Sequence, residues 1–479
     1  MNKKFFILPL VAASAFLALT ACDPSNKRGE NELYITVYDG GYGTEWIDQV
    51  AKDYQEKTGV QVHWTADQSI LDRMDSELEN PESDIYMSHD IRWQEYAEAG
   101  EIECLDDLYE SEVEGTGRTF KQRLCGGAEE VSKLEDGHYY KVCYTQGAGG
   151  FIYNKTMFEE NGWDVPETYD ELVTLCQAIV DAHIQTDDLV EVKPIGWSGA
   201  DREYYWDYIV FEWWAQLGGK GAIDDFKAYL GNDGRYSTGY QVYDPSDNHK
   251  EFVQAYQKWY DLIVGHPSFS ISKPQDERLF QVNSKFASGQ VAMIPYAQWA
   301  KYEIQQNSGI EFDFDIAMMK TPKVSATAQD YNYNVGFGDS MIIPSNIPDS
   351  SKEAAKDFLR YLAGKEACKT FVDKARGAFL AFDYSIVDLG DLLNDTYIKS
   401  VYEKLTTCTN VNVCSMNPVA YINSASIMPW IGNTYYYSKA FSAPSNTAYQ
   451  STAVGQSLYQ TAQNGWASWV RLAGFGPNE

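Results

Sequence analysis

The sequence has few basic residues for its size. Lys and Arg number 38 against 69 Asp and Glu among 479 residues, which leaves a formal net charge of −31. Affinity for nucleic acid comes largely from Lys and Arg that neutralise phosphates, so no nucleic-acid partner is expected. Charged residues make up 22% and hydrophobic residues 44%, a composition typical of a globular chain. The length predicts two or three domains, or two large lobes.

Signatures of catalysis and of cofactor binding are also missing. The chain contains no GxGxxG, GxxxxGK[ST], GxSxG or HExxH motif. It has no CxxC pair and only six scattered His residues, so neither a metal site nor a cofactor is expected. No pair of carboxylates stands out among the many acids, and a glycosidase therefore has no positive support. We expect a protein that binds rather than catalyses.

The start of the chain predicts export and anchoring. Two lysines precede an uncharged apolar run over 5–19, which is shorter than the roughly 20 residues of a transmembrane helix and typical of a signal peptide. The run closes with Leu-Thr-Ala-Cys, which resembles the lipobox of bacterial lipoproteins. We therefore expect a signal peptide over 1–21, lipidation of Cys22 and a polar tether over 22–31. The expected location is the outer face of the cytoplasmic membrane: the surface of a cell with one membrane, or the periplasm of a cell with two.

Seven of the eight cysteines follow the predicted anchor, and an extracytoplasmic location permits disulfides. Cys408 and Cys414, in a polar stretch, are the favoured pair. Cys104 with Cys125 is the second candidate pair. Two cysteines in helical patterns are expected to be buried as small apolar side chains: Cys176 and Cys368.

Alternating strand and helix patterns predict an α/β fold with a parallel sheet. Residues 33–38 predict a buried strand, and apolar residues then recur at helical spacing from Trp46 to Tyr54, until Gly59 ends the helix. Further strands are expected at 60–64, 84–87, 149–153, 291–295 and 335–343. Further helices are expected at 70–78, 204–217 and 252–264. Two more helices should begin with capping boxes, at Thr168 with Glu171 and at Ser350 with Glu353, whereas 231–249 should form an exposed loop.

Aromatic residues are abundant: 13 Trp, 35 Tyr and 21 Phe. Many lie beside glycines and polar residues rather than within apolar runs. A sugar ring presents a C–H face that a flat aromatic ring can cover, while Asp, Asn, Gln or Arg bind its hydroxyl rim. The pattern favours a carbohydrate ligand.

Five stretches, in order, resemble the family 1 extracellular solute-binding lipoproteins of bacterial ABC importers, with maltose-binding protein as the nearest familiar pattern. The first includes a Glu-Lys-Thr-Gly-Val run. The third carries Tyr-Asn-Lys and Pro-x-Thr-x-x-Glu-Leu, and the fourth carries an Ala-Met strand followed by Trp299. The stretches cover 33–64, 83–108, 150–176, 286–300 and 335–367.

The resemblance implies a periplasmic-binding-protein-like fold, in which two α/β lobes with interleaved chain and hinge strands enclose a ligand cleft. By motif, lobe one would comprise 32–150 plus 335–400, and lobe two 151–334 plus 401–479. Such a protein is a monomer that captures a carbohydrate, here an oligosaccharide. It closes around the ligand by a hinge motion and delivers it to the membrane permease subunits of an ABC importer.

The same resemblance implies a set of ligand-binding residues. Two lie in the loop after the first strand, two follow the third strand, and the others are aromatic residues later in the chain. They are Asp39, Tyr42, Asp90, Arg92, Trp197, Trp299, Trp430 and Tyr436.

Two alternatives stay open. The same scaffold could bind a different solute, such as a peptide or a polyamine, and the strong acidity favours a cationic ligand. The chain could also be a surface glycoside hydrolase, which would release sugar from an oligosaccharide where a receptor would retain it intact.

Overall fold

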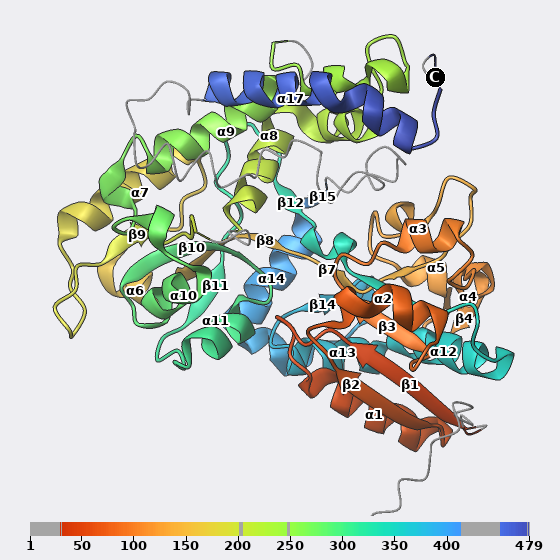
Figure 1. Cartoon of the computed structure of the whole chain (residues 1–479). Helices are drawn as coiled ribbons and strands as arrows, with labels where there is room; N and C mark the ends of the chain where they lie inside the picture. Colours follow the sequence, from red (N-terminus) through yellow and green to blue (C-terminus); the bar gives the residue numbers. More distant parts are fainter. Residues whose placement is uncertain are drawn as a thin grey trace, which may run out of the picture.

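A computed structural model describes residues 29, 31–200, 205–246, 250–412, 451–476 and 478. The predicted signal peptide, Cys22 and most of the predicted tether lie outside these residues. Within the described part of the chain, no helix is both long and apolar enough to cross a membrane. Two sheets with their helices form two lobes, which Figure 1 shows side by side.

The first lobe is built on a five-stranded sheet with the order β2-β1-β3-β13-β6. β1 runs parallel to β2 and β3, with Ile35 opposite Ile85, whereas β13 is antiparallel to β3 and β6. The strands are β1 (Glu32–Val37), β2 (Gln61–Ala66), β3 (Ile85–Ser88), β6 (Val142–Cys143) and β13 (Ser340–Ile342). The helices are α1 (Glu45–Thr58), α2 (Ile70–Glu79), α3 (Trp93–Glu98), α4 (Asp106–Glu110), α5 (Phe120–Arg123), α12 (Asp349–Leu362) and α13 (Lys365–Lys374).

α1 shows how the sequence pattern produces the element. Its apolar positions fall at helical spacing and are all buried against the sheet and α13. Gly59 then ends the helix in the left-handed region, with φ of 78°, and donates its N–H to the Gln55 carbonyl. The predicted helix and its end are both confirmed.

The second lobe is built on a four-stranded sheet with the order β11-β8-β10-β9. β8 is antiparallel to β10 and β11, and β9 is parallel to β10. The strands are β8 (Gly149–Asn154), β9 (Lys193–Ile195), β10 (Val291–Ala297) and β11 (Ile316–Met318). The helices are α6 (Lys155–Asn161), α7 (Tyr169–Ala182), α8 (Trp206–Ala228), α9 (Lys250–Ile263), α10 (Leu279–Ala287), α11 (Ala300–Ser308) and α17 (Ser451–Leu472), the last lying over α9 at the top of Figure 1.

Segments between the two sheets form short ladders of their own. β7 (Thr145–Gln146) pairs with β14 (Phe379–Leu380), and β12 (Tyr331–Tyr333) pairs with β15 (Thr409–Val411). The crossing segments touch, because the Gly147 N–H donates to Asn334 Oδ1 at 2.7 Å. α14 (Thr396–Thr407) packs against β11 of the second lobe. The remaining hairpin is β4 (Glu112–Val113) with β5 (Arg118–Thr119), and the 3-10 helices are η1 (Glu130–Ser132), η2 (Tyr236–Tyr243), η3 (Pro267–Phe269), η4 (Pro274–Asp276), η5 (Val335–Gly338), η6 (Tyr384–Ile386) and η7 (Gly390–Asn394).

Much of the aromatic excess fills the second lobe. Trp206 stacks on Trp259, with ring centroids 5.8 Å apart, and Trp214 packs against Phe252 at 4.6 Å. These rings join α8 to α9 in a core that α17 completes. Aromatic composition alone therefore overstates the evidence for a sugar site.

Three local predictions are wrong. Residues 236–243 of the expected exposed loop form the 3-10 helix η2, which buries Val242 and Tyr243 against α17. α12 begins at Asp349 after Pro348, without a side-chain cap from Ser350. The strand expected over 335–343 is confined to β13 at 340–342, because residues 335–338 form a 3-10 helix instead. The capping box of Thr168 with Glu171 is confirmed at the start of α7.

Candidate functional site

The loop after β1 reaches from the first lobe to the second. Gly41 lies so close to Trp299 that an added β-carbon would stand 2.9 Å from the indole ring. Gly43, which has φ of +63°, lies equally close to the ring of Tyr302. Only glycine permits this approach, since any side chain would hold the lobes apart. The glycine-rich turn in the sequence therefore sets the contact between the lobes.

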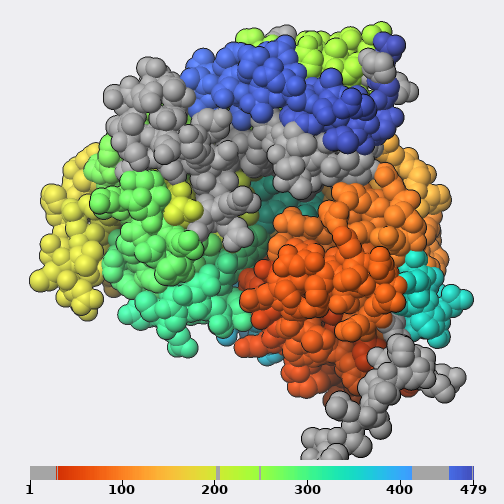
Figure 2. Space-filling view, viewed as in Figure 1, coloured from red at the N-terminus to blue at the C-terminus, as the bar shows by residue number. Residues whose placement is uncertain are grey.

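Beside this contact lies a hollow of about 300 Å³ between the lobes. Figure 2 shows the lobes as separate masses, red to orange and yellow to green, that meet along a furrow. The first lobe contributes lining residues from the loops after β1 and β3, and the second contributes the starts of α8 and α11. The segment that returns to β13 forms the floor, with Val335, Gly338 and Asp339.

Aromatic rings from both lobes frame the hollow. The rings of Trp299 and Tyr42 meet edge to face, with centroids 5.9 Å apart and planes at 87°. Tyr205, at the start of α8, meets Trp299 from the other side at 5.6 Å. Such rings supply flat apolar surfaces with polar tips. Tyr42 and Trp299, both predicted from the sequence, thus come together from opposite lobes.

Asp339 lies at the centre of a hydrogen-bond cluster that the sequence did not predict. The Tyr42 hydroxyl donates to its Oδ2 at 2.8 Å, and the Thr145 hydroxyl donates to the same oxygen at 3.0 Å. Burial raises the pKa of the Asp339 carboxyl, although the hydrogen bonds oppose that rise. Burial also raises the pKa of the Tyr42 phenol, which therefore donates as a neutral hydroxyl. The cluster ties the first loop to the segment between the sheets.

Two further carboxylates line the hollow. Glu303 on α11 accepts hydrogen bonds from the hydroxyls of Tyr296 and Tyr205, at 2.9 and 3.2 Å. Asp90 follows β3 with φ of 50°, a strained conformation for a residue other than glycine, and its Oδ2 lies 3.0 Å from His89 Nδ1. Among the described residues, no Lys or Arg lines this hollow. The lining of the hollow is therefore predominantly acidic.

Ser88, at the end of β3, also lines the hollow. Its side chain is buried, and its hydroxyl finds no hydrogen-bond partner in the described part of the chain. A buried hydroxyl without a partner is costly, so a bound hydroxyl or a water would satisfy it. The sequence offers no signal for this residue beyond its place at the end of a strand.

Three predicted site residues lie elsewhere. Asp39 is half-buried near Tyr302, whose pKa is raised by burial and then by the charge of Asp39, and it does not line the hollow. Arg92 forms ion pairs with Asp75 at 2.5 Å and Glu95 at 2.8 Å. These contacts hold the guanidinium on the surface of the first lobe, so the structure does not bring it into the cleft.

Trp197 is 1% exposed inside the second lobe, where its indole N–H donates to Ser270 Oγ at 2.8 Å. Its ring packs edge-on to Trp259, because the IGWSG turn points it into the core, and it does not line the inter-lobe hollow. Trp430 and Tyr436 lie outside the described residues.

The cysteine pairings have different outcomes. Cys104 and Cys125 are free thiols, so that second candidate pair is wrong. Cys414, the predicted partner of Cys408, lies outside the described residues. The two cysteines predicted to be buried, Cys176 and Cys368, are fully enclosed in the core.

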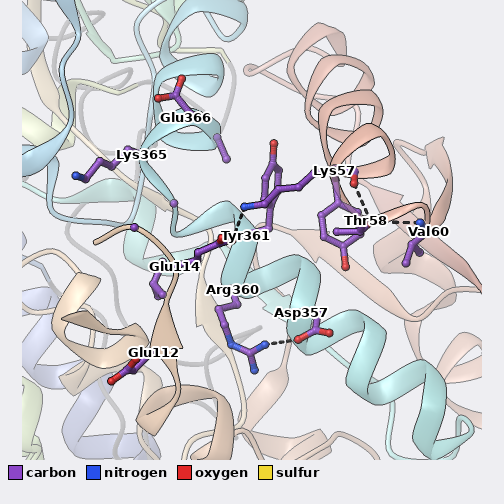
Figure 3. A pocket seen from close by; sticks show the side chains of 15 residues that line it. Lys57, Thr58, Val60, Glu112, Glu114, Asp357, Arg360, Tyr361, Lys365 and Glu366 are labelled. Carbon is purple, nitrogen blue, oxygen red and sulfur yellow. Dashed lines mark hydrogen bonds and ion pairs between the residues drawn. The ribbon is translucent and has the colours of Figure 1, made fainter. Parts of the chain in front are cut away.

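A larger hollow, of about 810 Å³, lies on the flank of the first lobe between α1, the β4–β5 hairpin and the junction of α12 with α13 (Figure 3). Two of its cations pair with acids that also line it. Lys57 donates to Glu114 at 2.5 Å and lies over the ring of Tyr361, while Arg360 pairs with Asp357. In this hollow acids face cations, whereas the described lining of the smaller hollow contains no Lys or Arg and includes the unpartnered Ser88 hydroxyl.

Comparisons with known proteins agree with this architecture. The chain is 28% identical over 163 residues to the diacetylchitobiose binding protein NgcE of Streptomyces coelicolor, a match that covers 33% of this chain and 34% of that protein. It is 22% identical to the multiple sugar-binding protein of Streptococcus mutans over 78% of this chain and 81% of that one. The solved structure of apo RafE from Streptococcus pneumoniae superposes with a TM-score of 0.65 at 18% identity, covering 91% of this chain and 99% of that one.

These structural similarities confirm the periplasmic-binding-protein fold that the sequence predicts. The sequence profile described as bacterial extracellular solute-binding protein matches residues 49–382, which is well over half of the chain. That segment contains both sheets except β1, and every described lining residue of the inter-lobe hollow that follows the first loop. The chain belongs to the family of bacterial extracellular solute-binding proteins.

Proposed function

We propose that the chain is a lipid-anchored extracytoplasmic receptor that captures a small saccharide between its lobes and delivers it to the permease subunits of an ABC importer. The related proteins support the ligand class: NgcE is named for diacetylchitobiose, and RafE has been solved in complex with raffinose. The receptor acts as a monomer, anchored through Cys22, and makes or breaks no bond in its ligand.

One observation carries the proposal: rings and hydrogen-bonding groups from both lobes face one hollow. Trp299 and Tyr205 belong to the second lobe and Tyr42 to the first, while Asp339 lies on the segment between the sheets. A saccharide placed there would pack its C–H faces against the rings and donate hydrogen bonds from its hydroxyls to the carboxylates. Because the ligand contacts both lobes only when they are close, its binding favours the closed state.

The charge of the hollow narrows the ligand class. Asp90, Glu303 and Asp339 line it without a Lys or Arg among the described lining residues. A uronic acid or a sugar phosphate would bring its negative charge against these carboxylates. The ligand is therefore a neutral or amino-substituted saccharide, and a hollow of about 300 Å³ suits a short one.

Calorimetry on the purified chain tests the proposal. Probes are neutral oligosaccharides, including diacetylchitobiose and raffinose, with galacturonic-acid oligosaccharides, short peptides and spermidine as comparisons. We expect heat from at least one neutral saccharide and none from the uronates. Heat from peptide or polyamine alone would overturn the ligand class.

The same samples separate a receptor from a glycoside hydrolase. After incubation at equal concentrations of protein and saccharide, a receptor returns the intact saccharide when it is denatured. Appearance of shorter sugars, in proportion to time and protein, would instead identify an enzyme.

A further inference from the structure

A group of three donor side chains lies on the first lobe, apart from the cleft. Cys104, Asp106 and His138 each offer one ligand atom, and these atoms all lie within 4.8 Å of one another. Among the described residues, this is the one group of three or more His, Cys, Asp or Glu side chains close enough to share an ion. The sulfur, oxygen and nitrogen come from two segments that are more than thirty residues apart.

The backbone holds the two segments together. The Leu105 N–H donates to the Tyr139 carbonyl at 2.7 Å, and the Tyr139 N–H donates to Asp106 Oδ1 at 3.0 Å. The rings of Tyr109 and Tyr139 stack at 3.9 Å, which fixes α4 against the segment that carries His138. A tight turn, closed by the Leu134 N–H on the His138 carbonyl, presents the imidazole. The three donors therefore stand on supported backbone, as a binding site requires.

Without an ion, His138 and Asp106 are joined by a hydrogen bond, and an ion would require these two side chains to move slightly apart. His138 Nδ1 lies 2.6 Å from Asp106 Oδ2, and a small outward rotation of the half-exposed imidazole would admit an ion between them. Ligand bonds of roughly 2.0–2.3 Å in a tetrahedral zinc site place the donors about 3.3–3.8 Å apart. The exposed side leaves room for a water as fourth ligand.

We propose that Cys104, Asp106 and His138 form a site for a divalent transition metal of the zinc class. Thiolate sulfur and imidazole nitrogen select zinc, cobalt or nickel over calcium and magnesium, which take oxygen ligands. The ion would join the loop before α4 to the turn at 133–139, and it would stabilise the folded first lobe because the unfolded chain does not hold the three donors together. The site is independent of saccharide binding.

Cobalt titration of the full chain, reduced and freed of metal, tests the proposal. Cobalt bound to a thiolate in a tetrahedral site shows a sulfur-to-metal charge-transfer band together with intensified visible bands. We expect both with the wild-type chain, displacement of cobalt by zinc, and a rise in the melting temperature on adding either ion. A spectrum of hydrated cobalt alone would overturn the site.

Variants locate the ligands. Cys104→Ser should abolish the charge-transfer band, and His138→Gln should weaken cobalt binding by at least about tenfold. His183→Gln is the matched control, because His183 Nδ1 also faces a carboxylate, that of Glu191 at 3.2 Å. Cys408→Ser controls for the other partly exposed thiol among the described residues. A band that survives Cys104→Ser, or disappears with Cys408→Ser, would overturn the assignment.

Discussion

The hollow on the flank of the first lobe and the hollow between the two lobes differ in size and in chemistry. The flank hollow is the larger, and two of its cations, Lys57 and Arg360, pair with acids that also line it. The inter-lobe hollow is smaller, and it gathers carboxylates without cations, rings from both lobes and the unpartnered Ser88 hydroxyl. Volume alone therefore does not locate a ligand site; the chemistry of the lining and its origin from both lobes favour the smaller hollow.

Removal of the Trp299 ring should give the largest loss of saccharide affinity and so distinguish the two hollows most clearly. Trp299→Ala should weaken saccharide binding by about 30-fold or more, because Trp299 is a partly buried ring at the meeting of the two lobes and large aromatic anchors dominate such interfaces. Calorimetry measures the loss. Trp163→Ala, which removes a ring packed on Phe158 in the second lobe, is the matched control and should leave affinity unchanged. Equal affinities in all three proteins would remove Trp299 from the site.

Replacing one aspartate in each hollow by asparagine compares how much the two hollows contribute to saccharide affinity. Asp339→Asn should weaken saccharide binding by about tenfold, since a hydrogen bond to a charged acceptor is stronger than one to a neutral acceptor. Asp357→Asn makes the same change in the flank hollow, where only the ion pair with Arg360 is lost. Calorimetry should show no change in that variant. A larger loss with Asp357→Asn than with Asp339→Asn would reverse the comparison.

The contributions of acidic residues to stability should also change with pH in opposite directions in the two regions. Burial raises the pKa of Asp207, between the lining residues Tyr205 and Tyr208, to about 7. Its contribution to stability is complete below its ordinary pKa and is lost as pH rises through about 7. Asp207→Asn should therefore gain about 1 kcal/mol in unfolding free energy relative to wild type between about pH 4 and pH 8, after allowance for partial exposure.

Urea unfolding at several pH values measures this difference. Glu114 in the flank hollow provides the contrast, because its hydrogen bond from Lys57 lowers the pKa of its carboxyl. Its contribution is present at neutral pH and is lost as pH falls, so Glu114→Gln should differ from wild type only at the neutral end. If the difference in unfolding free energy between wild type and Asp207→Asn did not change with pH, the raised pKa of Asp207 would be contradicted.

The smallest effect concerns a contact between the lobes beside the cleft. Arg376, in the loop after α13, donates to Gln305 Oε1 at 3.0 Å and lies over the ring of Tyr302 on α11. Arg376→Ala should lower saccharide affinity by about threefold, because a partly exposed contact of this kind contributes under about 1 kcal/mol to the closed state. X-ray scattering should show a larger radius of gyration without ligand. Arg360→Ala, in the flank hollow, should change neither measurement.

Local sequence patterns were sufficient for many of the elements. The spacing from Trp46 to Tyr54 predicted the buried face of α1, and Thr168 with Glu171 predicted the start of α7. They failed where tertiary packing overrides local preference. The polar stretch around Tyr243 forms a 3-10 helix because α17, some 200 residues later, covers it.

The sequence predicted only some of the residues that line the candidate site. Tyr42, Asp90 and Trp299, which the family resemblance implies as ligand-binding residues, line the hollow, and their contact with a ligand stays a prediction. Trp197 and Arg92 do not line it, since a motif places a residue near a turn without saying which way the side chain points.

What the sequence determined by itself is the family, the α/β elements and the shortage of basic residues, because each depends on composition or on residues close together in the chain. Only the tertiary structure brought Tyr42, Asp339 and Trp299 to one hollow, since Tyr42 lies more than two hundred and fifty positions before the other two. The structure likewise placed His138 beside Cys104. Backbone pairing and packing between distant segments decide such meetings, and no local pattern records them.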